Sequence, residues 1–159
     1  MRKIIFSGLL LAAMVSCQND DASTTNNSNS DPSLVEFTSV GKENLYGNGA
    51  EEINESNLVI NDNAAWQDLL GQMTTVNDLP FGFGDPNVDF SQWTVIATFD
   101  KVQMSGGFAI DVVSVTEENG GVVVDVEKTG GGSGAEATVI TQPFHIVKIP
   151  KTNLPVTFE

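Results

Sequence analysis

Side chains that could carry out catalysis are few in this sequence. His145 is the single histidine, and it stands in a run with the alternation of a β-strand, where it is better explained as a core or edge residue than as a general base. A serine–histidine site would have to pair it with a serine from a glycine-rich segment, such as Ser105 or Ser133. With 21 acidic residues, the spacing of carboxylates carries no information about a glycosidase. We predict no catalytic residue; a hydrolase that uses carboxylates or His145 is the alternative.

Oxygen ligands for a cation occur at alternate positions in one short segment. Asp85, Asn87 and Asp89 are similar to the start of a calcium loop, but Phe90 occupies the position of its glycine and Ile96 that of its glutamate. We therefore predict no metal site, and these three residues are the only candidate ligands. No zinc spacing or phosphate-binding glycine loop is present in the sequence, so no cofactor is predicted.

The one cysteine, Cys17, follows the features of an export signal. Arg2 and Lys3 form a positive n-region, residues 4–15 form an apolar h-region, and a small residue precedes the cysteine. The apolar run is too short to cross a bilayer as a permanent helix. A thiol at this place can carry the acyl chains of a bacterial lipoprotein, and several chains together anchor stably. We expect a signal peptide at 1–16 and lipidation of Cys17; a signal cut elsewhere, leaving a free cysteine, is the alternative.

Residues 17–33 form a polar segment behind that cysteine. They cannot bury enough apolar area to offset chain entropy, so we predict a flexible tether. Asp20 and Asp21 are similar to the surface-export signals of lipoproteins in the Bacteroidetes, and a plain soluble linker is the alternative. We expect the protein on the bacterial outer membrane, facing the periplasm or the cell surface.

The charge balance excludes some partners. Seven basic residues stand against 21 acidic ones, giving a net charge of −14. Loss of Arg2 and Lys3 with the signal peptide would leave five basic residues and a net charge of −16. Phosphate contacts need clustered Lys and Arg, so nucleic acids are excluded as partners and phosphorylated substrates are disfavoured.

Residues 34–159 are long enough for one domain with a core, and their apolar residues mostly alternate. Residues 93–99 are apolar enough for a buried central strand. The alternation changes parity between Val112 and Val113, which predicts a β-bulge, and residues 118–121 predict the turn of a hairpin. Further strands are expected at 35–40, 58–60, 122–126, 137–140 and 144–149.

One amphipathic helix interrupts the strands. Its apolar residues, at helical spacing, are Trp66, Leu69, Leu70 and Met73. Asp62 or Asn63 offers the N-cap, and residues 76–88 form a long ordered loop. The predicted fold class is mainly β: an antiparallel β-sandwich or partly closed barrel, with this helix packed on it through the Trp66 face.

Several segments in chain order resemble a known family. They are Val-Asp-Phe-Ser at 88–91, the strand that ends at Phe99, Ser-Gly-Gly-Phe-Ala-Ile at 105–110 and Gln-Pro-Phe-His-Ile-Val-Lys-Ile-Pro-Lys at 142–151. Together they resemble the C-terminal domain of the PrcB protease-complex subunit family over about residues 55–152. That pattern is a VDF-S segment, a TGGY-like turn and a closing PYH-V-(I/L)P strand.

The chain departs from this pattern at Ser105, at Phe108 and at the glycines 130–132. The resemblance implies an accessory lipoprotein subunit of a surface protease complex, without catalysis of its own.

Three segments are candidate binding loops. Their residues are Met104, Ser105, Gly106, Gly107, Gly131, Gly132, Pro143 and Phe144. Their chain order is similar to that of three inhibitory loops in chagasin-type inhibitors of papain-like cysteine proteases, although this chain has no Asn-Pro. At Gly106 and Gly107 we favour the interpretation that they only form a tight turn into a strand and that Phe108 fills the core, because Phe108 shares its parity with Ile110 and Val112. Met104 is the candidate contact residue, because a flexible thioether suits an adaptable surface.

We therefore expect a lipid-anchored, non-catalytic binding or accessory module whose partner is a protease or envelope protein. A chagasin-like inhibitor, a hydrolase and a purely structural role in the envelope are the alternatives.

Overall fold

The computed structural model describes residues 31–131 and 138–159. The predictions for the signal peptide, for Cys17, for tether residues 17–30, for Gly132 and for Ser133 lie outside the described residues. None of the helices among the described residues has the length and apolar character needed to span a membrane.

The described residues form strands and one helix in a simple order. They are β1 (Ser33–Leu34), β2 (Thr38–Leu45), β3 (Ser56–Ile60), α1 (Asn63–Met73), β4 (Trp93–Phe99), β5 (Ala109–Glu118), β6 (Gly121–Thr129), β7 (Gln142–Pro150) and β8 (Val156–Phe158). Ser33, predicted as the last tether residue, already pairs with Glu117 in β1.

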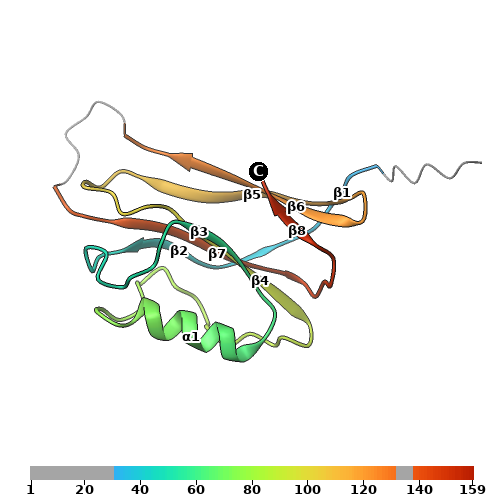
Figure 1. Ribbon diagram of the computed structural model, residues 1–159, viewed down its shortest axis with the longest axis horizontal. Coiled ribbons are helices and arrows are strands. Elements are labelled where there is room, and N and C mark those ends of the chain that lie inside the picture. Colours follow the sequence, from blue (N-terminus) through green and yellow to red (C-terminus); the bar gives the residue numbers. More distant parts are fainter. Residues whose placement is uncertain (1–30, 132–137) are drawn as a thin grey trace, which may run out of the picture.

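Two four-stranded sheets pack face to face, as Figure 1 shows. The first sheet has the order β1-β5-β6-β8 and the second has the order β2-β7-β4-β3. The predicted sandwich is confirmed, and no closed barrel forms among the described strands. One strand pair departs from the predicted antiparallel arrangement, because β8 runs parallel to β6. The chain can reach that position because residues 151–155 carry it from the end of β7 in one sheet to the edge of the other.

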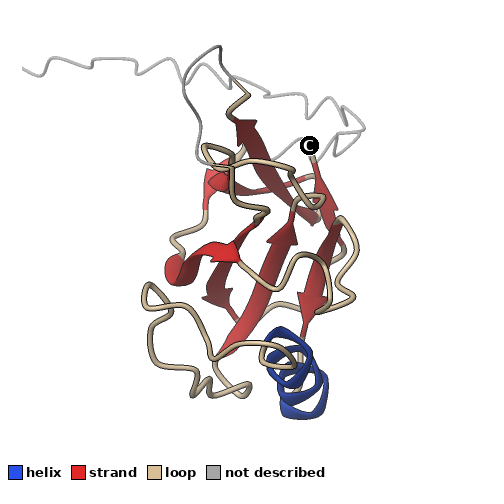
Figure 2. Ribbon diagram, turned by 90° about the vertical axis from the view of Figure 1, so that its left-hand side faces the viewer, coloured by secondary structure: helices blue, strands red, loops and turns tan. Residues whose placement is uncertain are grey.

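The predicted helix begins and ends as expected and covers the outer face of the second sheet (Figures 1 and 2). Asp62 caps it, accepting a hydrogen bond from Ala65 N at 3.0 Å. Trp66 is fully buried in a cluster with residues of β4 and β7, and its Nε1 donates to Pro86 O at 2.7 Å, which ties the 76–88 loop to the helix. The central strands of the second sheet, β4 and β7, are therefore buried on both faces, which explains why β4 carries apolar residues on both.

The predicted bulge and hairpin are both confirmed. The register of β5 against β6 shifts between Val112 and Ser114, so that Val112 and Val115 are buried while Val113 is exposed. At the tip, Asn119 and Gly120 have φ angles of 50° and 77°, which suit a two-residue hairpin turn.

The strand predicted at 137–140 is wrong within the described residues. Residues 138–140 belong to no strand, and pairing begins at Thr141, which bridges Gln103. The strand predicted at 35–40 is displaced along the chain. Residues 35–37 belong to no strand, and β2 runs from Thr38 to Leu45 with an irregularity between Ser39 and Gly41.

Candidate functional site

The turn between β4 and β5 displays one apolar side chain to solvent. Gln103 and Thr141 exchange two backbone hydrogen bonds, of 2.7 and 3.0 Å, and Thr141 Oγ1 donates to Ser105 O at 3.0 Å. These bonds fix both sides of the turn. Met104, between them, is 77% exposed, and its contact with a partner stays a prediction. We call residues 103–108 the Met104 turn.

The glycines after β6 pack directly against this turn. Gly130 and Gly131 have φ angles of 117° and 78°, which L side chains rarely adopt. A Cβ on Gly130 would lie 2.6 Å from Phe108 Cα, and one on Gly131 would lie 3.1 Å from Phe108 Cε1. The structure thus brings together two of the three predicted binding loops, those at Gly106–Gly107 and at Gly131. Gly132 lies outside the described residues.

The favoured prediction that Phe108 fills the core, which was made from its parity, is wrong. Phe108 is half-buried and lies over Gly130 and Gly131, outside the two buried clusters of the described chain. The Phe108 ring therefore packs over Gly130 and Gly131 at the end of the Met104 turn, because a side chain at either glycine would leave no room for the ring.

The third predicted loop, at Pro143 and Phe144, is wrong. Both residues lie inside β7 and are buried; the Phe144 ring packs against Phe83 and Phe99 with centroids 6.1 and 6.0 Å away. Pro143 is tolerated there because the Gln142 side chain replaces its missing N–H. Asp100 N donates to Pro143 O at 2.9 Å, and Gln142 Nε2 donates to Asp100 O at 2.9 Å.

A charged cluster lies beside the two glycine turns. Lys128 Nζ, on β6, forms ion pairs with Glu55 and with Asp100, the latter at 2.9 Å. The Asp100 side chain is 5% exposed and also accepts a hydrogen bond from Gln103 Nε2 at 2.6 Å. Burial would raise the pKa of Asp100, but hydrogen bonds from Lys128 and Gln103 outweigh it and hold this pKa below its ordinary value. The hydrogen bond with Glu55 raises the pKa of Lys128. Asp100 and Lys128 therefore stay ionised at neutral pH, and the ion pairs tie β6 to the loop before β3.

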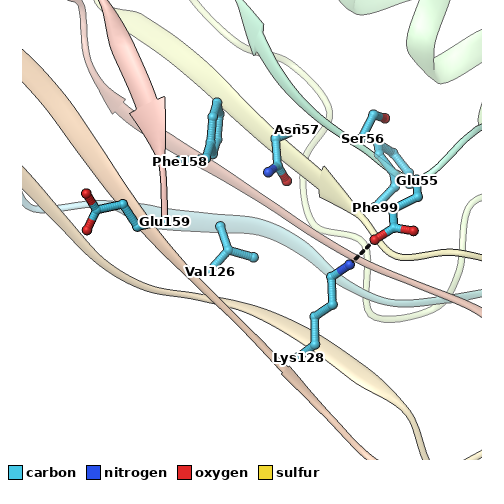
Figure 3. A pocket seen from close by; sticks show the side chains of 8 residues that line it. All are labelled: Glu55, Ser56, Asn57, Phe99, Val126, Lys128, Phe158 and Glu159. Atoms are coloured by element: carbon cyan, nitrogen blue, oxygen red, sulfur yellow. Dashed lines mark hydrogen bonds and ion pairs between the residues drawn. The ribbon is translucent and has the colours of Figure 1, made fainter.

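An open groove runs from this cluster along the gap between the two sheets, as Figure 3 shows. We call it the edge groove; its volume is about 650 Å³. The lining residues are Glu55, Ser56, Asn57, Phe99, Val126, Lys128, Phe158 and Glu159. A second hollow, of about 280 Å³, shares Glu55 and Lys128 and reaches Phe108 and Gly130. The groove and the glycine turns thus form one continuous surface at this end of the sandwich.

His145 lies inside β7, buried, as expected for a core position. The backbone N–H of Val112 donates to Nδ1 at 3.0 Å, and Nε2 lies 3.3 Å from Ser39 Oγ. Asp111 Oδ1 is 3.5 Å from Nδ1 and forms an ion pair with Lys42. Ser39, rather than Ser105, is therefore the described serine beside this histidine.

This arrangement resembles a serine–histidine–aspartate triad but has the wrong tautomer. Because Nδ1 accepts the Val112 N–H, the proton of the neutral ring is assigned to Nε2, which then cannot accept the Ser39 proton. Burial lowers the pKa of His145, and Asp111 only partly opposes this effect. The histidine serves to satisfy a backbone N–H of the β5 bulge and to join the two sheets.

The carboxylates of the candidate calcium ligands Asp85 and Asp89 accept hydrogen bonds from residues two positions later in the chain. Asp85 Oδ1 accepts hydrogen bonds from Asn87 N at 2.9 Å and Asn87 Nδ2 at 2.7 Å. Asp89 Oδ1 likewise accepts from Ser91 N and Oγ. These bonds hold the pKa of each aspartate below its ordinary value. In the part of the chain that is described, no three His, Cys, Asp or Glu residues are grouped to hold a metal ion.

Three features of the described residues were not predicted from the sequence. Lys128, Glu55 and Asp100 come from separate parts of the chain, and no spacing rule would group them. Phe158 belongs to a strand of only three residues, too short for a periodic pattern. Phe81, in the 76–88 loop, is fully exposed, and its neighbours Pro80 and Gly82 mark only a turn.

Comparison with known proteins places part of the chain in a family. Residues 94–150 match the family model described as PrcB C-terminal. Residues 94–150 belong to the PrcB C-terminal family. No curated protein and no solved structure matches the chain. The match is shorter than the expected 55–152.

The PrcB C-terminal match runs from β4 to the end of β7 and so includes the central strands of both sheets. It contains the Met104 turn, Asp100, Lys128 and His145. Strand β3, helix α1 and strand β8 lie outside it, and two of these contribute to the edge groove.

Proposed function

We propose that this protein is a lipid-anchored, non-catalytic accessory module that binds a protein partner, as a subunit of a protease complex at the bacterial outer membrane. The PrcB C-terminal match supports the accessory role, and the Cys17 export signal supports the anchor. The observation that carries the binding role is the exposure of Met104, on a turn that is fixed at both sides and adjoins the edge groove.

A rigid turn with a flexible apolar tip suits recognition of another protein. The backbone of the turn loses little conformational freedom on binding, because its hydrogen bonds already exist in the free chain. The thioether of Met104 can adapt to the partner surface. The chagasin-like alternative has less support, since it needs three loops and the segment at Pro143 is a buried strand.

Cross-linking from the turn tests this function. The full, acylated chain would carry a photoreactive residue in place of Met104, and cross-linked proteins would be captured from native membranes and identified by mass spectrometry. A control chain would carry the same residue at Asp68, an exposed position of helix α1. We expect a protein, and protease activity, to be captured through position 104 alone. Capture of no protein, or of the same proteins through both positions, would contradict the proposal.

Replacement of the contact side chain gives a second test. Met104→Ala should weaken partner binding while the melting temperature stays nearly unchanged, because the side chain is exposed. Val113→Ala removes another exposed apolar side chain, on β5, and should leave binding unchanged. An equal loss of binding and of thermal stability in Met104→Ala would indicate a structural role instead.

A further inference from the structure

We propose that the free edge of strand β3 binds an extended peptide of the protein partner that carries Lys or Arg, so that the peptide adds a strand to the second sheet. This inference rests on the proposed protein-binding function and names the chemistry of the bound segment. Strand β3 is the last strand of its sheet, and its five residues pair with β4 without a register shift. Its sequence, Ser-Asn-Leu-Val-Ile, contains none of the Pro, Lys or Arg residues that usually protect an edge.

The other edges of the described sheets are protected. The edge of β2 is covered by the loop before β4, because Gly41 bridges Phe83 and Gly84 N donates to Val40 O at 2.7 Å. Strand β1 has two residues and β8 has three, too few for a stable added strand. Within residues 31–131 and 138–159, no backbone hydrogen bond reaches the outer side of β3.

The sheet register identifies the backbone groups that are free. Asp100 N donates to Pro143 O, so in the antiparallel β4–β7 pair the even-numbered residues of β4 bond to β7 and the odd-numbered ones face β3. Phe99, Ala97 and Val95 are opposite Ser56, Leu58 and Ile60. The N–H and C=O groups of Asn57 and Val59 therefore point away from the sheet. These two residues can pair with an incoming strand.

The side chains of the same two residues face the first sheet. Asn57 is opposite Thr98 and Val59 is opposite Ile96, which lies in the buried cluster between the sheets. A peptide paired with β3 would therefore direct alternate side chains toward the edge groove, where Phe158 and Val126 offer an apolar wall (Figure 3). Val59 is 37% exposed, so this surface is accessible in the free chain.

The charges of the groove favour a basic peptide. Its one ammonium group, on Lys128, is already paired with Glu55 and Asp100, while Glu159 lies at the opposite end of the groove (Figure 3). A Lys or Arg of the peptide could pair with Glu159 and with the remaining oxygen of Glu55. A second copy of this chain fits less well, because each copy carries a net charge of −14.

Selection of peptides by the full chain tests the inference. The probe is a phage-displayed library of short random linear peptides, and synthetic copies of the selected peptides would be measured by fluorescence anisotropy. Val59→Pro changes the side chain and removes one backbone N–H, which faces outward, a place where an edge strand tolerates proline. The matched control, Val59→Thr, keeps that N–H. We expect peptides rich in Lys or Arg whose affinity falls about tenfold or more in Val59→Pro, equivalent to one or two net hydrogen bonds, and less than about threefold in Val59→Thr.

The charge of the groove is tested in the same assay. Glu159→Gln should weaken the selected peptides severalfold, whereas Asp68→Asn, which removes a carboxylate from helix α1, should leave their affinity unchanged. Amide hydrogen exchange on the unmodified chain is independent of any variant. Bound peptide should slow exchange at Asn57 and Val59.

Several results would overturn the inference: no peptide is selected, the selected peptides are not basic, or they bind Val59→Pro as tightly as the unmodified chain. Unchanged exchange at Asn57 and Val59 would overturn it even if Val59→Pro failed to fold. The proposed function fails separately. If a folded Val59→Pro chain captured the native partner normally, peptide binding at the β3 edge would be refuted and the proposed protein-binding function would stand. If no native partner were captured by any chain, only the proposed function would be refuted.

Discussion

The hydrogen bond from Val112 N to His145 Nδ1 joins the two sheets, and its removal should have a measurable cost. His145→Leu keeps an apolar side chain of similar size but leaves the buried Val112 N–H without an acceptor. His145→Gln keeps a side-chain oxygen that can accept. We expect the free energy of unfolding of His145→Leu to be about 1–3 kcal/mol below that of His145→Gln, the cost of an unsatisfied buried donor.

The same histidine should make the stability of the protein depend on pH. Burial lowers the pKa of His145 in the folded chain below the ordinary value of 6.5, which the unfolded chain retains. As the pH falls below 6.5, the unfolded chain binds the proton first. The contribution of neutral His145 to stability is therefore fully present above this pH and is lost as the pH falls toward the lower pKa of the folded chain. The slope of this loss cannot exceed about 1.4 kcal/mol per pH unit for one group.

Urea unfolding at a series of pH values measures both effects. The carboxylates titrate in every variant, so the quantity of interest is the difference between the unmodified chain and His145→Gln. We expect this difference to become less favourable to the unmodified chain as the pH falls below about 6.5. Nitrogen chemical shifts should place the ring proton on Nε2. Equal stability of the two variants, or a ring proton on Nδ1, would refute the reasoning and restore His145 as a possible base.

Four further substitutions have expected outcomes, three of them argued from the described contacts and the one at Cys17 argued from the sequence. Gly130→Ala should lower the free energy of unfolding by about 1–3 kcal/mol, because its φ of 117° and the Phe108 backbone leave no room for a Cβ. Gly71→Ala, with nothing within 4 Å, should raise it by about 0.5–1 kcal/mol, and thermal unfolding that gave both variants one sign would contradict this. Lys128→Met should raise the pKa of Asp100, which NMR titration of the carboxyl carbon would detect. It should lower the free energy of unfolding by no more than about 1 kcal/mol at neutral pH, because the lysine is half exposed. In this variant, protonation of Asp100 on acidification should also cost less stability than in the unmodified chain. Cys17→Ala should release the chain from the membrane fraction and abolish incorporation of labelled fatty acid, and persistent membrane association would argue against the anchor.

Much of the fold could be predicted because its signals are local. The parity change at Val113 identified the bulge, since one extra residue in a strand moves every later side chain to the other face. The helix was predicted from the spacing of Trp66, Leu69 and Met73 together with the Asp62 cap. Met104 was singled out as an exposed candidate because a flexible thioether suits an adaptable contact, and its side chain is exposed.

The errors arose where long-range contacts decide the local structure. Proline normally ends a central strand, and Pro143 was placed in a turn because nothing in the sequence reveals that the Gln142 side chain replaces its N–H. Strand β8 is stabilised by parallel pairing with β6, which lies more than thirty residues away. The ion pairs of Lys128 with Glu55 and Asp100 likewise join residues that are far apart in the sequence, so they could be identified only from the structure.

Pro143 affects the alignment in which β4 and β7 of the second sheet pair. A strand with one polar face cannot slip by one residue without exposing its apolar side, but β4 and β7 are apolar on both faces and lack that constraint. A two-residue slip that placed Pro143 opposite Thr98 would leave a carbonyl inside the ladder without its donor. In the observed alignment the gap falls at Asp100, just past the end of β4, where Gln142 fills it. Pro143 therefore disfavours this slip and helps to select the observed alignment of β4 and β7.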